Sequence, residues 1–191
     1  MNQRPFVLDN CSFLNLYASG RLDAIAAVLE RPIVIGDVVQ KEALYIFRGG
    51  DDDDAGDVMP VDCEPLIAQG ILSVASLASD ELSTFVDIAR TVDDGEAATL
   101  ALALHRDYAV VTDDGKAIKL LHTRAPRVSH HSTLAVLKAW IDRAVLPPME
   151  TRLVLKAVCQ RGHFEFPRRD PLRSWAEAVL GGPVQLPRRH S

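Results

Sequence analysis

The stretch DDGEAATLALALHRDYAVVTDDGKA, residues 93–117, decides how this chain can fold. It is apolar almost all round from residue 97 to 104, which predicts a deeply buried helix. The short run AVV at 109–111 predicts a strand, and Asp113 and Asp114 follow that strand closely. A glycine and a helix-like pattern come next, so one of the two aspartates is expected to cap a second helix. A buried helix, a strand and a further helix in succession are typical of an α/β fold.

The rest of the chain repeats this alternation of short apolar strands and helices. Strands are predicted at 5–9, at 32–36 and, nearer an edge of the sheet, at 71–77. A helix is predicted at 38–47 with Asp37 as its N-cap. The pattern predicts an α/β fold, a three-layer α/β/α sandwich with a central mostly parallel sheet.

The chain has 191 residues and contains no internal repeat or clear linker, so a single domain is expected over residues 1–180. Its C-terminal part is predicted to be helical from about residue 132 and to end in a helix at 172–180. Residues 181–191 are expected to be a disordered tail.

Composition limits the classes of protein to consider. The net charge is −5, and the stretch GGDDDDAGD at 49–57 supplies five of the acidic residues. The rest of the chain therefore has equal numbers of acidic and basic residues. Charge therefore neither supports nor excludes a nucleic-acid substrate. The run of aspartates is expected to be a solvated, mobile loop because no apolar element fixes it. No secretory segment is seen at the N-terminus and the three cysteines lack paired spacing, so a cytoplasmic protein with reduced thiols is expected.

Acidic side chains lie near the ends of the predicted strands. Asp9 ends the first strand, and Asp113 and Asp114 follow the AVVT strand. Glu42 and Glu96 belong to helices that begin near the same edge. Ligands of open parallel sheets bind beyond the carboxyl ends of the strands, so these acids are expected to converge there.

Converging carboxylates repel one another, and a divalent cation removes that conflict. Hard oxygen ligands suit Mg²⁺ or Mn²⁺, and both cations contact phosphate oxygens. The chemistry expected of such a site is metal-assisted hydrolysis of a phosphodiester.

Several of these segments, in this order, resemble the PIN domain, the metal-dependent nuclease fold of VapC-type toxins. FVLDNCSFLNLYASGRLDAI resembles the first strand of that family, with its metal-binding aspartate at Asp9, and GDVVQKEAL resembles the segment that carries Glu42. The stretch 93–117 resembles the branch with a GEA motif before a buried helix and a TDD motif after the next strand. The resemblance covers residues 5 to about 180.

The resemblance implies a Mg²⁺- or Mn²⁺-dependent endoribonuclease that acts as the toxin of a toxin–antitoxin pair. RNA is then the substrate, an antitoxin protein is the expected partner, and a homodimer is expected. It implies metal binding by Asp9, Glu42, Glu96, Asp113 and Asp114, with all but Asp113 assigned as catalytic.

The residues around the acids carry further expectations. Cys11 stands where the family has Ser or Thr, so support of the first carboxylate would come from Cys11, Ser12 and Thr112. Basic residues after the TDD motif are candidates for contacts with the RNA backbone, although a solvated helix face explains them equally well: Lys116, Lys119 and Arg124.

Some residues have a simpler structural interpretation, and other functions are also considered. The adjacent His130 and His131 point to opposite faces of a strand, and Cys159 with His163 supplies only two ligands, so both pairs are interpreted as structural. A PIN-like binding module that has lost nuclease activity is the alternative function. A metal-dependent phosphatase on another α/β fold lacks the Asp-x-Asp pair expected after the first strand.

Overall fold

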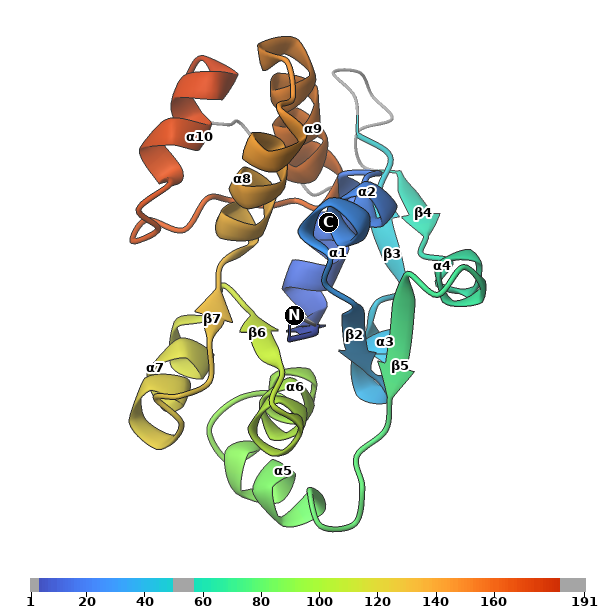
Figure 1. Ribbon diagram of the computed structural model, residues 1–191, viewed down its shortest axis with the longest axis vertical. Coiled ribbons are helices and arrows are strands. Elements are labelled where there is room, and N and C mark those ends of the chain that lie inside the picture. The colour runs from blue at the N-terminus through green and yellow to red at the C-terminus, as the bar shows by residue number, and fades with distance from the viewer. Residues whose placement is uncertain (1–3, 50–56, 183–191) are drawn as a thin grey trace. The chain divides into compact units, whose positions relative to one another are not determined.

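The computed structural model describes residues 4–49 and 57–182 (Figure 1). The contacts of the chain divide it into two compact units whose segments alternate along the sequence. We call Met1–Phe13, Glu30–Ala43 and Asp62–Ser132 the sheet unit, and Leu14–Leu29, Leu44–Val61 and Thr133–Ser191 the helical unit. The single-domain organisation expected for residues 1–180 stays a prediction.

The sheet unit contains a parallel sheet. Within the described part of the chain its five strands have the order β5-β2-β1-β6-β7. The strands are β1 (Phe6–Leu8), β2 (Ile33–Gly36), β5 (Leu72–Ala75), β6 (Ala109–Val111) and β7 (His130–His131). Every neighbouring pair is parallel, and β5 lies at an edge as predicted. This confirms the α/β class with a central parallel sheet.

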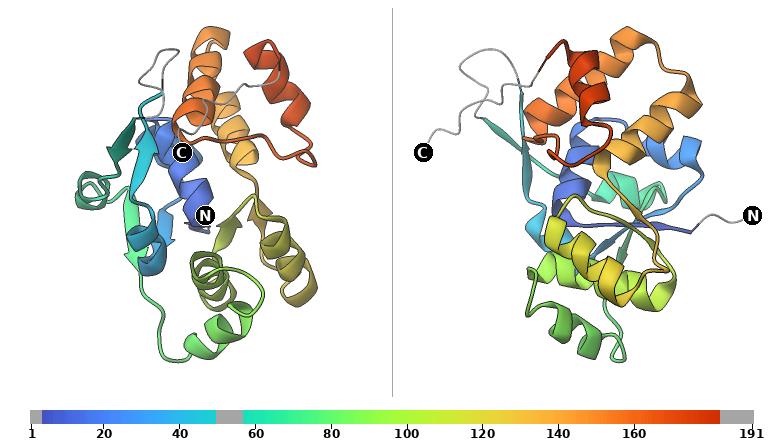
Figure 2. Two further views of the ribbon diagram at one scale, coloured as in Figure 1. Left: turned by 180° about the vertical axis from the view of Figure 1, so that it is seen from behind. Right: turned by 90° about the vertical axis from the view of Figure 1, so that its left-hand side faces the viewer.

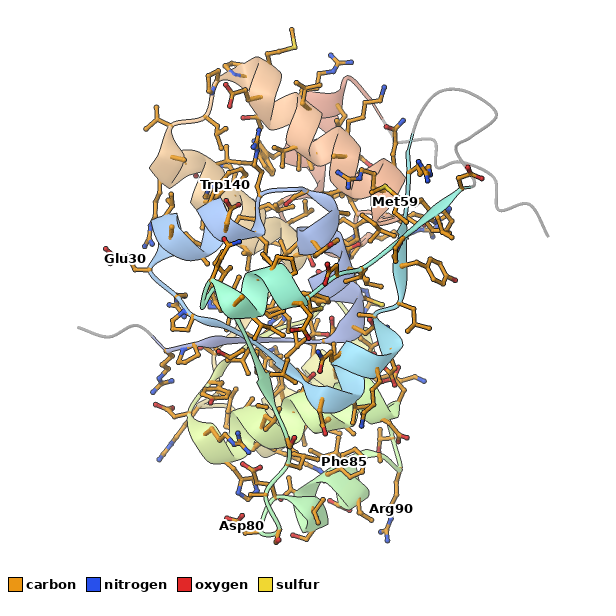
Figure 3. The ribbon with its side chains drawn as sticks, turned by 90° about the vertical axis from the view of Figure 1, so that its right-hand side faces the viewer. Glu30, Met59, Asp80, Phe85, Arg90 and Trp140 are labelled. Carbon is orange, nitrogen blue, oxygen red and sulfur yellow. The ribbon has the colours of Figure 1, made fainter. Side chains whose placement is uncertain are left out.

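The register of the strands explains the hydrophobic core on one face of the sheet. Val7 of β1 lies opposite Val34 of β2 and Val110 of β6, so the three side chains share one face of the sheet. They pack in one cluster with apolar residues of the helices that cover this face (Figures 1 and 2). Phe85 packs against the same cluster from its helix (Figure 3). The helices of the sheet unit are α3 (Asp37–Glu42), α4 (Glu64–Ala68), α5 (Leu82–Ile88), α6 (Asp94–Arg106) and α7 (Gly115–Arg124).

Helix α6 is as buried as its sequence predicts. Its residues from Ala97 to Ala103 are all buried, and α6 contacts β1, β2 and β6. An α-helix with apolar residues on every side is stable only where protein surrounds it. Because α6 packs against β1, β2 and β6, its N-terminus is held in a fixed position relative to the ends of these strands.

The helical unit contains the remaining elements. α1 (Asn10–Ala18) begins in the sheet unit, and α2 (Leu22–Leu29), α8 (Thr133–Ala144), α9 (Pro148–Arg161) and α10 (Arg173–Leu180) follow along the chain. α2 packs against α8, and α9 packs against α10 and β3. Trp140 of α8 is buried (Figure 3). The helical C-terminal part predicted from about residue 132 and the last helix predicted at 172–180 are confirmed.

The helix predicted over residues 38–47 is wrong in its second half. α3 ends at Glu42, and Tyr45–Phe47 forms β3, which pairs antiparallel with β4 (Val58–Pro60). Aromatic and β-branched residues favour such a strand once a partner is present, and that partner begins only at Val58. Asp37 is also not the N-cap, because Gly36 holds that position and α3 has no side-chain cap.

The expected mobile aspartate loop and disordered tail lie outside the described residues, except for Gly49, Asp57 and residues 181–182. Among the described residues, no helix is long and apolar enough to cross a membrane. All three cysteines are free, as expected from their spacing.

Candidate active site

Asp9 lies where β1 ends and α1 begins. Its side chain is only 3% exposed. Its Oδ1 accepts a hydrogen bond of 2.7 Å from the amide of Ser12, and its carbonyl accepts one of 2.9 Å from the amide of Phe13. The carboxylate is therefore fixed at the N-terminus of α1, where the helix dipole favours a negative charge.

Asp114 occupies the equivalent position on α7. Its Oδ1 accepts hydrogen bonds from the amides of Lys116 at 2.7 Å and Ala117 at 2.8 Å. Asp114 is thus the N-cap of α7, which confirms that one of the two aspartates caps this helix. Asp113 precedes it and is half-buried.

Glu96 lies in the first turn of α6. Its amide donates a hydrogen bond of 2.8 Å to Oδ1 of Asp93, the N-cap of that helix. Burial, followed by the charges of Asp114, Asp93 and Asp9, raises the pKa of Glu96 to about 7. Asp9, Glu96 and Asp114 therefore lie within electrostatic reach of one another although they are far apart in sequence.

The pKa of Asp9 responds to the same neighbours. Burial raises it, hydrogen bonds from Thr112 and Ser12 oppose that rise, and the charge of Asp114 adds to it. The helix N-termini and hydrogen bonds favour the ionised form, but burial and repulsion together outweigh them. Without a cation, this group of carboxylates is electrostatically unfavourable.

Glu42 reaches the site from the end of α3. A Cβ atom placed on Gly95 would lie 2.5 Å from Oε2 of Glu42, so the carboxylate lies directly against the first turn of α6. Loss of hydration, followed by the charges of Asp93 and Asp94, raises the pKa of Glu42. The absence of a side chain at Gly95 thus makes room for Glu42 beside the other acids.

The residues expected to support the first carboxylate have different roles. Ser12 and Thr112 are buried and hydrogen-bond Asp9. Cys11 is exposed, and desolvation together with the charges of Asp9, Glu96, Asp93 and Asp113 raises the pKa of its thiol to about 11. The thiol is therefore neutral near pH 7 and lies within electrostatic reach of the same acids.

The basic candidates on α7 also differ. Lys116 and Lys119 are exposed. Arg124 forms an ion pair with Asp87 of α5, so its guanidinium group already has a partner within the protein. Of the three, Lys116 lies nearest in sequence to Asp114, in the first turn of α7.

The two pairs interpreted as structural make ordinary packing contacts. The His131 ring lies edge-on to Phe6, 5.2 Å between centroids. Cys159 is fully buried, and the His163 ring lies 5.2 Å from that of Phe47. These contacts agree with the structural interpretation of His131, Cys159 and His163.

Asp93 is the residue of this site that was not expected from the sequence. It caps α6 and contributes to the raised pKa of both Glu42 and Glu96. The signal was present as the spacing Asp93-x-x-Glu96, which is the spacing of an N-cap and its third helical residue.

The donor set fits a hard divalent cation in its chemistry. Across residues 4–49 and 57–182, no three His, Cys, Asp or Glu side chains stand close enough to hold an ion as they are placed. Burial, and after it repulsion from neighbouring carboxylates, raises the pKa of Asp9, Glu42 and Glu96, and a bound cation would offset that repulsion. Carboxylate oxygens are the ligands that Mg²⁺ and Mn²⁺ prefer, and Asp114 keeps its Oδ2 outside the capping bonds.

The protein combines a parallel α/β sheet with acidic side chains near the carboxyl ends of the strands, and this combination indicates the class of protein to which it belongs. A family model described as a PIN domain matches residues 5–164, and the chain therefore belongs to the PIN-domain family. PIN domains are generally nucleases, and their three-layer α/β/α fold agrees with the fold predicted from the sequence. No curated protein matches the chain.

Proposed function

We propose that this PIN domain is a Mg²⁺- or Mn²⁺-dependent endoribonuclease. The observation that carries the proposal is the coupling of Asp9, Glu96 and Asp114 at the carboxyl edge of the sheet. Neighbouring acids with raised pKa values are typical of functional sites, because acids with a structural role are usually paired with lysine or arginine side chains.

Asp9, Glu96 and Asp114 would hold the cation, with Glu42 and Asp113 beside them. When bound, the cation would polarise a phosphate oxygen and lower the pKa of the attacking water. The chain itself keeps the carboxylates in place: Ser12 and Thr112 orient Asp9, and two amides of α7 orient Asp114. The exposed Lys116 and Lys119 are proposed to contact the RNA backbone.

A role as the toxin of a toxin–antitoxin pair, and assembly as a homodimer, are part of the proposal and rest on the resemblance to VapC-type proteins. The chromosomal neighbourhood tests the toxin role. A short upstream gene whose product has a DNA-binding N-terminus would support it.

The direct test of the proposed function is RNA cleavage. A pool of random-sequence RNA oligonucleotides carrying a fluorophore and a quencher is incubated with the protein and Mn²⁺. Asp9→Asn and Asp114→Asn are expected to lower the rate by roughly 100-fold or more, since each removes a charged ligand. Asp142→Asn, an exposed aspartate of α8, is the matched control and should cleave normally. Equal rates for Asp9→Asn and the parent protein would refute the site.

The second candidate is a PIN-like binding module without nuclease activity. It is favoured by Cys11, which replaces a hydroxyl residue near Asp9. It is also favoured by the distances between the acids, because no three of the described side chains stand close enough to hold a metal ion. A binding module would show no cleavage and no binding of Mn²⁺ at millimolar concentration.

A further inference from the structure

His130 lies on the edge strand of the sheet, beside the end of β6. β7 has only two residues, and it pairs with Val110 and Val111 just before the TDD motif. Nε2 of His130 lies 3.1 Å from the carbonyl oxygen of Thr112. A carbonyl oxygen only accepts hydrogen bonds, so Nε2 carries the proton and donates it.

Thr112 connects this histidine to the acids. It is 1% exposed, and its amide donates a hydrogen bond of 3.1 Å to the carbonyl of His131. Its hydroxyl oxygen accepts one of 3.1 Å from the amide of Asp114, and its side chain also hydrogen-bonds Asp9. A carboxylate only accepts, so the hydroxyl donates its proton to Asp9. One side chain thus joins the carboxylate of Asp9 to the backbone amide of Asp114, two residues that follow the ends of different strands.

The backbone of Thr112 needs a fixed orientation for its hydroxyl to reach both partners. β7 supplies it on both sides of the residue, through the carbonyl of His131 and the ring of His130. The ring of His130 also lies edge-on to that of His122 on α7, with the centroids 6.4 Å apart. Without the donor at His130, the buried carbonyl of Thr112 would lose its hydrogen bond, which favours rotation of the Thr112–Asp113 peptide.

We infer that His130 is a positioning residue for the acidic site, acting through Thr112 on Asp9 and Asp114. The inference rests on the proposed function for its effect on catalysis. The geometry of the hydrogen bonds is independent of that function.

Three variants separate positioning from packing. His130→Gln keeps an N–H donor at a reach similar to that of Nε2, whereas His130→Leu keeps bulk and removes the donor. His131→Leu is the matched control, because His131 is the adjacent residue of the same strand and contacts Phe6, while its backbone bond to Thr112 is retained. Circular dichroism spectra establish that each variant is folded.

The reaction gives the first measurement. His130→Leu is expected to lower kcat for RNA cleavage and the affinity for Mn²⁺ by about 10- to 100-fold, with KM for RNA unchanged. His130→Gln and His131→Leu are expected to stay within about threefold of the parent protein, which is below that range. Normal kcat and Mn²⁺ affinity in folded His130→Leu, or equal losses in His130→Gln and His130→Leu, would overturn the inference.

A second measurement does not need the reaction. The amide of Asp114 donates to Thr112, so its hydrogen-exchange protection is expected to fall in His130→Leu and to persist in His130→Gln. Equal protection in both variants would also overturn the inference. If His130→Leu does not fold, His130→Asn replaces it, since its shorter side chain cannot reach the carbonyl. A parent protein that neither binds Mn²⁺ nor cleaves RNA would instead overturn the proposed function and leave the exchange measurement valid.

Discussion

At the residue scale, the same carboxylates take part in folding and in the proposed chemistry. Asp9, Asp93 and Asp114 each accept an amide hydrogen bond at the start of a helix, and Glu96 lies in the first turn of α6. The helix N-termini favour negative charge there. Burial and mutual repulsion act in the opposite direction, as the raised pKa values of Asp9 and Glu96 show.

The pKa of Glu96 predicts how stability changes with pH. It rises from 4.5 to about 7 in the folded protein, so the unfolded chain releases this proton first as pH increases. Without a divalent cation, the free energy of unfolding should therefore fall between about pH 4.5 and 7, on the order of 1 kcal/mol once screening is considered. Urea denaturation across this pH range measures it. Glu96→Gln should remove this part of the slope, and a slope unchanged in that variant would contradict the assignment.

Asp9→Asn should separate stability from activity. The amide oxygen can still accept from Ser12, while the buried charge and its repulsion with Asp114 disappear. At pH 7.5 without Mn²⁺ we expect the free energy of unfolding to stay equal or to rise by about 1 kcal/mol, although cleavage is lost. A loss of more than about 2 kcal/mol, which marks a large mutational effect, would show that Asp9 is needed mainly for folding.

At the scale of elements, the N-terminus of α6 is shaped to admit Glu42. Gly95→Ala would place a Cβ atom 2.5 Å from Oε2 of Glu42. Glu42 is exposed and can swing away, and alanine favours a helix over glycine by about 1 kcal/mol. The variant should thus be as stable as the parent or slightly more so, yet cleave RNA about tenfold more slowly, within the range seen for misplaced ligands. Thermal melts and initial rates test both parts, and undiminished cleavage would exclude a role for Glu42.

The other end of α6 is joined to the loop before α5 by a partly buried ion pair. Arg106 donates to both carboxylate oxygens of Glu81, at 2.7 and 2.6 Å, and also to the carbonyl of Ser76 at 2.7 Å. Glu81 is 3% exposed, and Oε2 also accepts from the amide of Ala78 at 2.7 Å. Removing one partner would leave the other charge buried and unpaired.

Arg106→Met should accordingly lower the free energy of unfolding by about 1–3 kcal/mol. The exposed Arg90→Met is the control, expected to stay within about 0.5 kcal/mol (Figure 3). The bonds to Arg106 lower the pKa of Glu81 from 4.5 to about 2. Its stabilisation is present above about pH 4.5 and is lost as pH falls toward about 2. Denaturant titrations at pH 7 and pH 3 measure both effects, and equal stability of the two variants would contradict them.

At the scale of the whole molecule, β1, β2 and β6 were predictable because each is a short apolar run that stops at a polar residue. Val7, Val34 and Val110 are adjacent in space, and their segments were identified from hydropathy alone. The end of α3 was not predictable in this way, because the partner of Tyr45–Phe47 is Val58–Pro60, more than ten residues further along the chain. Strand pairing between distant segments overrides local helical spacing.

The same distinction holds for the site. Asp9, Glu96 and Asp114 could be chosen from the sequence because parallel strands bring their carboxyl ends to one edge. The capping role of Asp93 was visible as a spacing, but its effect on Glu42 depends on how α3 packs against α6. The bond from His130 to Thr112 depends on the register of β7, which no local pattern fixes.

The central claim is that these acids bind a divalent cation, and calorimetric titration of Mn²⁺ tests it most directly. The parent protein should bind Mn²⁺ with a Kd of about 1 mM or tighter. Asp9→Asn should weaken binding at least about tenfold, and Asp142→Asn should leave it unchanged. The affinity of the parent protein should rise as pH increases toward about 7, where Glu96 loses its proton. No binding at millimolar Mn²⁺, or equal binding by the parent protein and Asp9→Asn, would contradict the account.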